Sequence, residues 1–335
     1  MKALAISLAV ALAAMPLAAM PLAAMPLAAQ DVRPEDVGFR AFSVASDSGA
    51  AEVYVSTEGR PADTLLTLPL VLYLQGSGFG PVYFGPPERP SHVLMLKPAD
   101  FAGFHYAVVG KPDAPFWAPA RGEATPAYHR ALTLGRRVAD ASAAVDLLAA
   151  QPWVDASRIV VVGHSEGAQV APALAASNGR VTHVAALAAS GLSQAFDFVL
   201  DVRRRVREGG LSFEEGEARI RALFAQLRRI EAAPAAADSL WRGHSYRRWA
   251  SFFEPPLDAF LSLDVPVFVA VGVDDEASPV ESADYLPVAF LLAGKDNLTY
   301  RAWPTDHRFQ QTLPDGERVD RRPDVVRALL EWVGE

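Results

Sequence analysis

The feature that most constrains this chain is a five-residue turn at positions 163–167, which separates two segments of opposite character. The turn has the sequence GHSEG and fits the pattern G-x-S-x-G. Before it stands the β-branched run RIVVVG, typical of a strand buried on both faces, and after it an Ala-rich segment predicts a helix over 166–177. A sharp strand-to-helix turn lifts the hydroxyl of Ser165 above the sheet. We therefore interpret Ser165 as a nucleophile, with a purely structural turn as the alternative.

The rest of the chain alternates between short apolar runs and amphipathic segments. Predicted strands lie at 53–56, 69–74, 105–109, 158–163, 181–189, 265–272 and 299–303. Predicted helices lie at 128–151, 166–177, 282–293 and 323–333. Strands that alternate with helices form parallel sheets covered on both faces. This order therefore predicts an α/β fold with a mostly parallel central sheet flanked by helices.

The segment 192–256 breaks this alternation. It is charged and helical in composition, as in GEARIRALFAQLRRIEAA, and it contains no convincing strand. We predict a helical cap insertion here, within an α/β core formed by 30–191 and 257–335. An ordinary set of surface helices in the same domain is the alternative. Two prolines at 255–256 mark the return to the core, since proline breaks helices.

Two sets of side chains in this segment have more than one interpretation. The arginine clusters are interpreted as solvated helix faces, with contact to an anionic substrate as the alternative; they stand at 203–205, 228–229 and 247–248. The aromatic residues predict a small core within the cap, with an acyl pocket as the alternative; they are Trp241, Tyr246, Trp249, Phe252 and Phe253.

The residue pattern of the N-terminal segment 1–29 indicates an export signal. Lys2 is followed by an apolar run in which the pentapeptide AAMPL occurs three times. A charged start, an apolar centre and small residues before the first polar cluster are typical of a secretory signal peptide. A membrane anchor is the alternative, but prolines at 16, 21 and 26 oppose one regular helix. We therefore expect a periplasmic or secreted protein, with no stable membrane span after signal cleavage.

Composition excludes several other classes of protein. The chain has no cysteine, so disulfides, a thiolate zinc site and a cysteine nucleophile are excluded. Hydrophobic residues make up 51% of the chain and the net charge is −8, which together oppose intrinsic disorder. No basic stripe dominates the sequence, so a nucleic acid is not expected as a partner.

From about Leu70 to the C-terminus, the chain resembles the α/β-hydrolase superfamily. The turn GHSEG is similar to that of bacterial esterases and serine peptidases of this fold, and 192–256 stands where the superfamily inserts caps. In that superfamily an acid and then a histidine follow the nucleophile along the chain. The resemblance implies a Ser–Asp–His triad in which Ser165 is the nucleophile.

The superfamily order directs the search for the acid and the histidine downstream of Ser165. Superfamily members often show a glycine, two residues, the acid, and a proline four residues later. Asp275 fits both spacings and Asp274 fits neither. The alternative is that both carboxylates only make a surface loop soluble. His307 is the only histidine after them and follows the last predicted strand. The resemblance therefore implies Asp275 as the acid and His307 as the base.

An oxyanion hole needs backbone N–H groups aimed at the developing negative oxygen. The resemblance implies that one comes from Glu166, the residue after the nucleophile. It implies that the second comes from Ser77, in the sequence QGSG that follows an early strand. Gln75 stands there where the superfamily usually has histidine, so the resemblance does not predict the conformation of this loop. A plain glycine-rich turn is the alternative.

These assignments together predict a serine hydrolase that cleaves carboxylic ester bonds through an acyl-enzyme on Ser165. A serine peptidase similar to the prolyl-oligopeptidase or aminopeptidase branches uses the same triad and is the first alternative. An exported binding protein that kept the fold without activity is the second. The expected substrate is a small-molecule ester or a short peptide. No cofactor and no metal are expected, because the triad mechanism needs neither.

Overall fold

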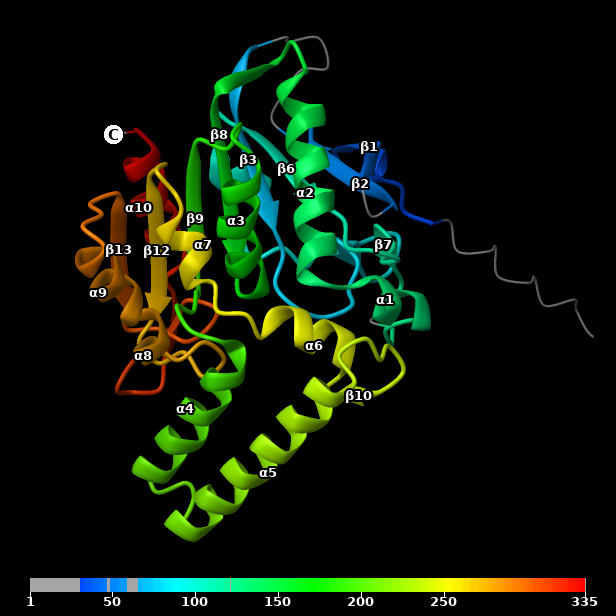
Figure 1. Cartoon of the computed structure of the whole chain (residues 1–335). Coiled ribbons are helices and arrows are strands. Elements are labelled where there is room, and N and C mark those ends of the chain that lie inside the picture. The colour runs from blue at the N-terminus through cyan, green and yellow to red at the C-terminus, as the bar shows by residue number, and fades with distance from the viewer. Residues whose placement is uncertain (1–30, 47–48, 59–65, 121, 335) are drawn as a thin grey trace, which may run out of the picture. The chain divides into compact units, whose positions relative to one another are not determined.

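The computed structural model describes residues 31–46, 49–58, 66–120 and 122–334. The predicted signal segment 1–29 lies outside the described residues. Eight strands form one sheet in the order β1-β2-β6-β3-β8-β9-β12-β13 (Figure 1). The strands are β1 (Phe39–Ser46), β2 (Gly49–Ser56), β3 (Leu68–Leu74), β6 (His105–Val109), β8 (Val154–His164), β9 (His183–Leu187), β12 (Val267–Gly272) and β13 (Leu298–Trp303).

The six strands from β6 to β13 in this order run parallel, whereas β1 and β2 add an antiparallel edge. The central strands are apolar along their length because both sheet faces are buried. The predicted α/β fold with a mostly parallel sheet is therefore confirmed. The sequence analysis missed β1, which alternates exposed and less exposed residues and lies at the edge of the sheet.

Helices cover both faces of the sheet. One face packs against α2 (Leu134–Ala149), α3 (Glu166–Ser177), α7 (Leu257–Leu261) and α9 (Tyr285–Leu292). The other face packs against the 3-10 helix η2 (Pro98–Phe101) and α10 (Arg322–Gly334). Each face of the sheet thus has its own apolar core.

Two helices predicted as continuous are divided in the structure. The segment 128–151 forms α1 (Pro126–Ala131) and α2, because Leu132 is extended and the Thr133 side chain accepts a hydrogen bond from the N–H of Arg136 at 3.1 Å. The segment 282–293 forms α8 (Val280–Ala283) and α9. Pro287 has no N–H to continue the helical hydrogen bonds at that point.

Between β9 and α7 the chain forms α4 (Gln194–Arg207), α5 (Phe213–Ala232) and α6 (Tyr246–Phe252). The prediction that this segment contains no strand was wrong. It contains one short hairpin, in which β10 (Leu240–Trp241) pairs with β11 (His244–Ser245). Neither strand joins the main sheet. The three helices lie beyond the carboxyl ends of the sheet strands (Figure 1). We keep the term cap for residues 192–256.

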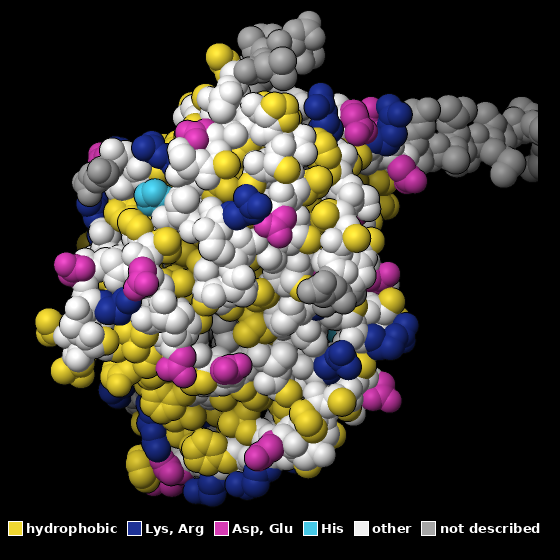
Figure 2. All heavy atoms as spheres, turned by 45° about the horizontal axis from the view of Figure 1, so that its top comes forward, with side chains coloured by type: hydrophobic (Ala, Val, Ile, Leu, Met, Phe, Trp, Pro, Cys, Tyr) yellow, Lys and Arg dark blue, Asp and Glu magenta, His cyan; other side chains and the backbone are white. Residues whose placement is uncertain are grey.

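Shorter elements complete the described chain. They are the 3-10 helix η1 (Pro34–Val37), a three-stranded sheet of β4 (Tyr83–Phe84), β5 (Ser91–His92) and β7 (Trp117–Ala118), and a hairpin of β14 (Gln310–Thr312) and β15 (Arg318–Asp320). On the face drawn in Figure 2, acidic and basic side chains are interspersed, and hydrophobic side chains gather toward the lower edge. Within the described ranges, no helix is both long enough and apolar enough to cross a bilayer.

Candidate active site

The turn between β8 and α3 holds Ser165 in a strained backbone conformation, with φ of 56° and ψ of −120°. Both flanking residues have to be glycine, because other backbone atoms approach them closely. A Cβ at Gly163 would lie 2.0 Å from the carbonyl oxygen of Gly167, and a Cβ at Gly167 would lie 2.1 Å from that of Leu74. Glycine at both positions therefore permits the tight turn that presents the Ser165 hydroxyl at the carboxyl edge of the sheet.

His307 contacts both of its predicted partners. Its Nε2 lies 2.9 Å from Ser165 Oγ, and its Nδ1 lies 2.8 Å and 2.9 Å from the two carboxylate oxygens of Asp275. With the proton on Nδ1, the imidazole donates to the carboxylate and accepts from the serine hydroxyl. The structure thus brings together three side chains from distant parts of the sequence. Ser165 and His307 are 142 positions apart.

Asp275, and not Asp274, faces the imidazole. Its side chain is buried, and it also accepts hydrogen bonds from the backbone N–H groups of Ala277 and Ser278, both at 2.8 Å. Asp274 is exposed, and its backbone N–H donates to the carbonyl oxygen of Thr305. The carboxylate of Asp275 is therefore fixed in place before substrate binds.

The loop after β13 is held so that His307 has little freedom. Asp306 Oδ1 accepts from the backbone N–H groups of Arg308 at 2.8 Å and Gln310 at 2.9 Å, which folds the loop around the histidine. The buried His164 places its Nε2 3.0 Å from the carbonyl oxygen of His307. Burial, followed by the nearby His307, lowers the pKa of His164 to about 3, so it stays neutral. The contact gives His164 a structural role beside the loop that carries His307.

The two predicted oxyanion donors lie beside Ser165. Glu166 is the first residue of α3, where a backbone N–H has no acceptor inside the helix. The loop with Ser77 approaches from β3, since a Cβ at Gly76 would lie 3.2 Å from Ser165 Cβ. Ser77 and Ser165 line one cavity. The role of the Ser77 N–H stays a prediction.

The chain was compared with known proteins. No family model and no curated protein matches it. Among solved structures, it is similar to a puromycin-hydrolyzing peptidase of Mycobacterium tuberculosis, at 18% identity and a TM-score of 0.54, over 88% of this chain and 39% of that one. It is also similar to an acylaminoacyl peptidase of Pyrococcus horikoshii, at 10% identity and a TM-score of 0.56, over 88% and 41%.

An esterase of Pyrococcus furiosus matches over almost its whole length, at 12% identity and a TM-score of 0.51, with 92% of this chain and 95% of that one covered. The chain has the α/β-hydrolase fold. It spans about two fifths of the two peptidase chains. The likeness establishes the fold, and the chemistry has to be argued from the residues of the site.

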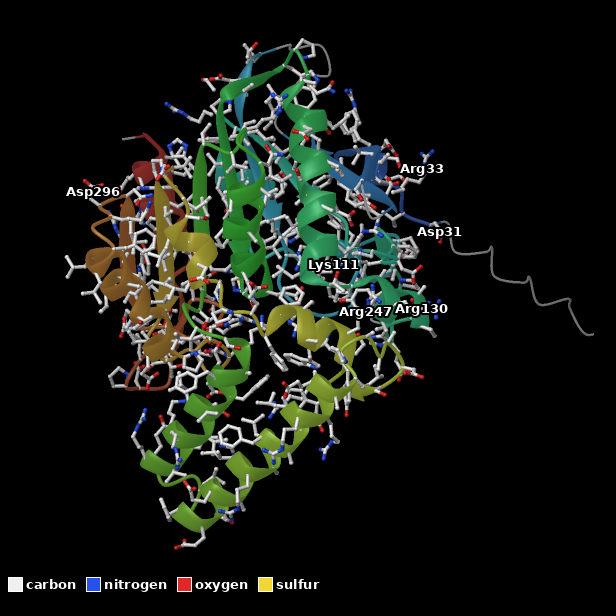
Figure 3. All side chains as sticks on the ribbon, viewed as in Figure 1. Asp31, Arg33, Lys111, Arg130, Arg247 and Asp296 are labelled. Atoms are coloured by element: carbon white, nitrogen blue, oxygen red, sulfur yellow. The ribbon has the colours of Figure 1, made fainter. Side chains whose placement is uncertain are left out.

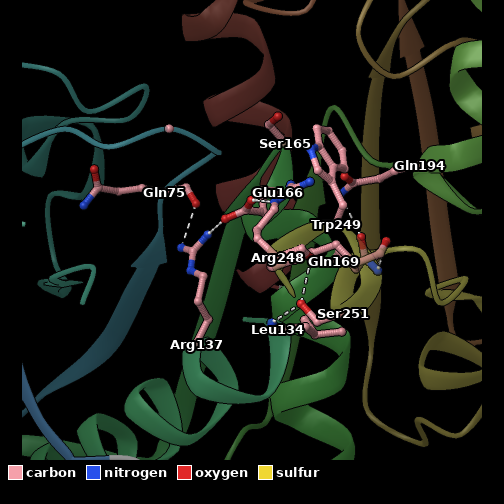
Figure 4. A network of polar contacts seen from close by, with 12 residues as sticks. Gln75, Leu134, Arg137, Ser165, Glu166, Gln169, Gln194, Arg248, Trp249 and Ser251 are labelled. Carbon is pink, nitrogen blue, oxygen red and sulfur yellow. Dashed lines mark hydrogen bonds and ion pairs between the residues drawn. The ribbon is translucent and has the colours of Figure 1, made fainter. Parts of the chain in front are cut away.

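Next to Ser165 in this α/β-hydrolase fold lies an ion network that was not predicted from the sequence. Glu166 Oε1 accepts from Arg137 Nη1 at 2.6 Å, and Glu166 Oε2 accepts from Arg248 Nη2 at 2.6 Å and Nε at 3.0 Å (Figure 4). Arg137 Nη2 also donates to the carbonyl oxygen of Gln75 at 2.8 Å. The network therefore joins α2, α3, the cap helix α6 and the loop of Ser77.

The interpretation of the arginines at 247–248 as a solvated face was wrong for Arg248. Its side chain is only 2% exposed, because α6 places it against the Glu166 carboxylate. Arg247 on the same helix is exposed. Adjacent residues on a helix point about 100° apart, so one faces the core and the other faces solvent. A glutamate inside the nucleophile turn was the available signal that a buried cation would be needed.

The network is permanently charged. Burial alone would raise the pKa of Glu166, but the guanidinium groups of Arg248 and Arg137 outweigh burial and lower that pKa to about 2. Lys111 lies close by, with its Nζ donating to the carbonyl oxygen of Gly78 at 2.6 Å. Burial, with the repulsion of Arg137, lowers the pKa of Lys111 to about 7.

Two hollows meet at Ser165. A cavity of about 140 Å³ lies on the cap side, between Ser165 and cap residues that include Phe198, His244, Arg248 and Trp249. We call it the cap-side cavity. A wider groove of about 960 Å³ lies on the other side, against the loop at 75–81 and His307. Substrate thus has room on both sides of the serine hydroxyl.

The cap aromatics pack together, and one of them also lines the cavity beside Ser165. Trp241, Trp249 and Phe253 pack together, with ring centroids 5.0 Å and 5.6 Å apart, as expected for a cap core. Trp249 also lines the cap-side cavity. Phe252 belongs instead to the main core beneath the sheet. His244, which had no assigned role in the sequence analysis, lines the cavity as well.

Among the described residues, no group of three or more histidine, aspartate or glutamate side chains is arranged to hold a metal ion.

Proposed function

We propose that this protein is a serine hydrolase that cleaves carboxylic esters through an acyl-enzyme on Ser165. The observation that carries the proposal is the pair of contacts made by His307, with Ser165 Oγ at 2.9 Å and with Asp275 at 2.8 Å. A histidine placed between a hydroxyl and a buried carboxylate is the arrangement that activates a serine nucleophile.

The reaction follows from these positions. His307 Nε2 takes the proton of Ser165 as the hydroxyl oxygen attacks the ester carbonyl carbon. Asp275 keeps the Nδ1 proton in place and stabilises the imidazolium that forms. The negative oxygen of the tetrahedral intermediate faces the N–H of Glu166 and, we propose, that of Ser77. The imidazolium then protonates the leaving alcohol, and water activated by His307 releases the acid.

The charge of the site favours an ester over the N-terminus of a peptide as substrate. An aminopeptidase needs unpaired carboxylates in its site to bind the ammonium group of the substrate. Here Glu166 is already paired with both Arg137 and Arg248, so the buried charge behind Ser165 is positive. This positive charge supports an ester substrate and opposes a substrate with a free amine.

A parallel assay tests the proposal. p-Nitrophenyl esters of increasing acyl length are measured beside aminoacyl and dipeptidyl p-nitroanilides at equal concentrations. We expect kcat/KM for the best ester to exceed that for the best amide by about 100-fold or more. A higher value for an amide would establish the peptidase instead. Absence of turnover with both sets, in a folded protein, would favour a binding protein.

We also propose that residues 1–29 act as an export signal. Expression of the full chain in a bacterium, followed by fractionation and N-terminal sequencing, should yield a periplasmic or secreted protein that begins near residue 30. An intact N-terminus in the membrane fraction would instead support the anchor.

A further inference from the structure

One nitrogen of Arg248 is buried without a partner. Nε and Nη2 donate to Glu166, whereas Nη1 has no hydrogen-bond partner among the described residues. The guanidinium carbon lies 4.2 Å from the ring centroid of Trp249 and 4.5 Å from that of Phe252. These aromatic contacts fix the plane of the group but do not satisfy the N–H bonds of Nη1. An unsatisfied buried donor is costly, so a partner from outside the chain would stabilise it.

The surrounding charge points to an anion as that partner. Two buried guanidinium groups, on Arg137 and Arg248, share the single carboxylate of Glu166. The cluster therefore carries a net positive charge of at least one. A buried charge without a counter-ion is strongly unfavourable, and an anionic substrate group would complete the cluster.

Arg248 lies on the wall of the cap-side cavity, beside Ser165. Arg248 and Ser165 both line the cavity, and Figure 4 shows the guanidinium between Glu166 and Trp249. His244 lines the same cavity, and its Nδ1 is likewise buried without a partner among the described residues. Two residues on the cavity wall, Arg248 and His244, thus each carry a buried nitrogen without a partner among the described residues.

One acidic side chain other than Glu166 stands among the described residues that line this cavity. It is Asp197, which accepts from Ser190 Oγ at 3.1 Å. Burial raises the pKa of Asp197 to about 7, so at neutral pH a large fraction of it is uncharged and does not cancel the arginine.

We propose that the cap-side cavity binds a carboxylate at the far end of the acyl chain, through Arg248 Nη1 with His244 beside it. The inference rests on the proposed function, and it names the substrate class as monoesters of short dicarboxylic acids. Hydrolysis breaks the acyl carbon–oxygen bond of the ester, and one water molecule supplies the oxygen and protons of the products. The products are the dicarboxylic acid and the alcohol, and no other reactant is required.

A pair of isosteric esters tests the inference. Ethyl hydrogen glutarate carries a carboxylate where ethyl 5-methylhexanoate carries an isopropyl group. With acid release followed by pH-stat, we expect kcat/KM to be at least 10-fold higher for the anionic ester. Arg248→Met should bring this ratio to 1 or below, and His244→Leu should lower it several-fold. Because the ratio compares two substrates of one protein, a general loss of activity cancels.

Arg247→Met is the matched control, because Arg247 is the exposed neighbour of Arg248 on α6 (Figure 3). It should keep the wild-type ratio. A wild-type ratio of 1 or below overturns the inference without any variant, so the test survives if Arg248→Met does not fold. A ratio that Arg248→Met leaves unchanged overturns it as well.

A binding experiment separates failure of this inference from failure of the proposed function. Ser165→Ala protein is titrated with each ester by calorimetry. Binding of ethyl hydrogen glutarate at least 10-fold tighter than that of the neutral ester supports the carboxylate site even if the wild type hydrolyses neither. Equal binding of the two esters overturns the carboxylate site and leaves the ester-hydrolase proposal intact.

Discussion

Two clusters of charged side chains meet the turn that carries Ser165, and they differ in exposure and in partners. The imidazole of His307 is 23% exposed and pairs with one buried carboxylate. In the other cluster Arg137, Glu166 and Arg248 are 5% exposed or less, and one carboxylate serves two cations. The first, open cluster is partly exposed to solvent, whereas the second, closed cluster is buried between α2, α3 and the cap helix α6.

This difference shows how the two clusters divide their work. A group that transfers protons, as proposed for His307, needs access to substrate and a partner that tolerates its change of charge, which is the role proposed for Asp275. A group that joins segments needs permanent charge and short contacts, which Glu166 has with α2 and α6. The comparison predicts that changes in the first cluster alter rate and that changes in the second alter stability and substrate choice.

The largest expected effect is on rate, in the open cluster. Asp275→Asn should lower kcat about 10⁴-fold, because asparagine does not hold the imidazole in the required tautomer. The thermal midpoint serves as the control for folding. Asp274→Asn is the matched variant, and it should retain activity within about threefold, since its side chain is exposed. Equal losses in both variants would break the comparison.

The next effect is on stability, in the closed cluster. Glu166→Gln leaves two buried guanidinium groups without a counter-ion, so the free energy of unfolding should fall by about 3–5 kcal/mol. Glu217→Gln removes a partly exposed ion pair with Arg203 and should cost about 1 kcal/mol or less. Urea denaturation measures both. A similar small cost for the two variants would show that the closed cluster does not anchor the cap.

The smallest effect is a pH dependence in the cap. Burial raises the pKa of Asp197, on α4, from an ordinary value near 4 to about 7. The folded state therefore binds this proton more tightly than the unfolded state, and stability falls as pH rises between these two values. Asp197→Asn should remove that fall and make the protein more stable than wild type at pH 8, by on the order of a few kcal/mol.

At pH 4 the Asp197→Asn variant and the wild type should be about equally stable. Urea denaturation across this pH range measures the difference. Curves that stay parallel from pH 4 to pH 8 would contradict the raised pKa.

The sequence predicted the sheet and the position of Ser165 because buried strands and the turn at 163–167 carry local signatures. Apolar runs such as VPVFVAVG mark strands buried on both faces, and β12 is found at Val267–Gly272 within that run. Ser165 lies between such a run and an Ala-rich helix. The order of residues in the superfamily then selected Asp275 and His307, and the structure places them in contact.

The closed cluster was not predicted because its partners have no local signature. Arg248 stands in an arginine-rich helix whose composition is that of a solvated surface, and only its packing against Glu166, 82 positions away, buries it. The division of α8 from α9 was missed for a similar reason, since the apolar pattern continues across it while Pro287 interrupts the hydrogen bonds. Long-range pairing and backbone hydrogen bonding are set by the fold.

The central claim is that the hydroxyl of Ser165 is activated by His307. A fluorophosphonate probe that modifies activated serines, followed by peptide mass spectrometry, tests it directly. We expect wild-type protein to be labelled once, on the peptide that contains Ser165, with labelling lost in Ser165→Ala and at least 100-fold slower in His307→Ala. A folded wild-type protein that remains unlabelled, or a label on another residue that persists in Ser165→Ala, would contradict the account.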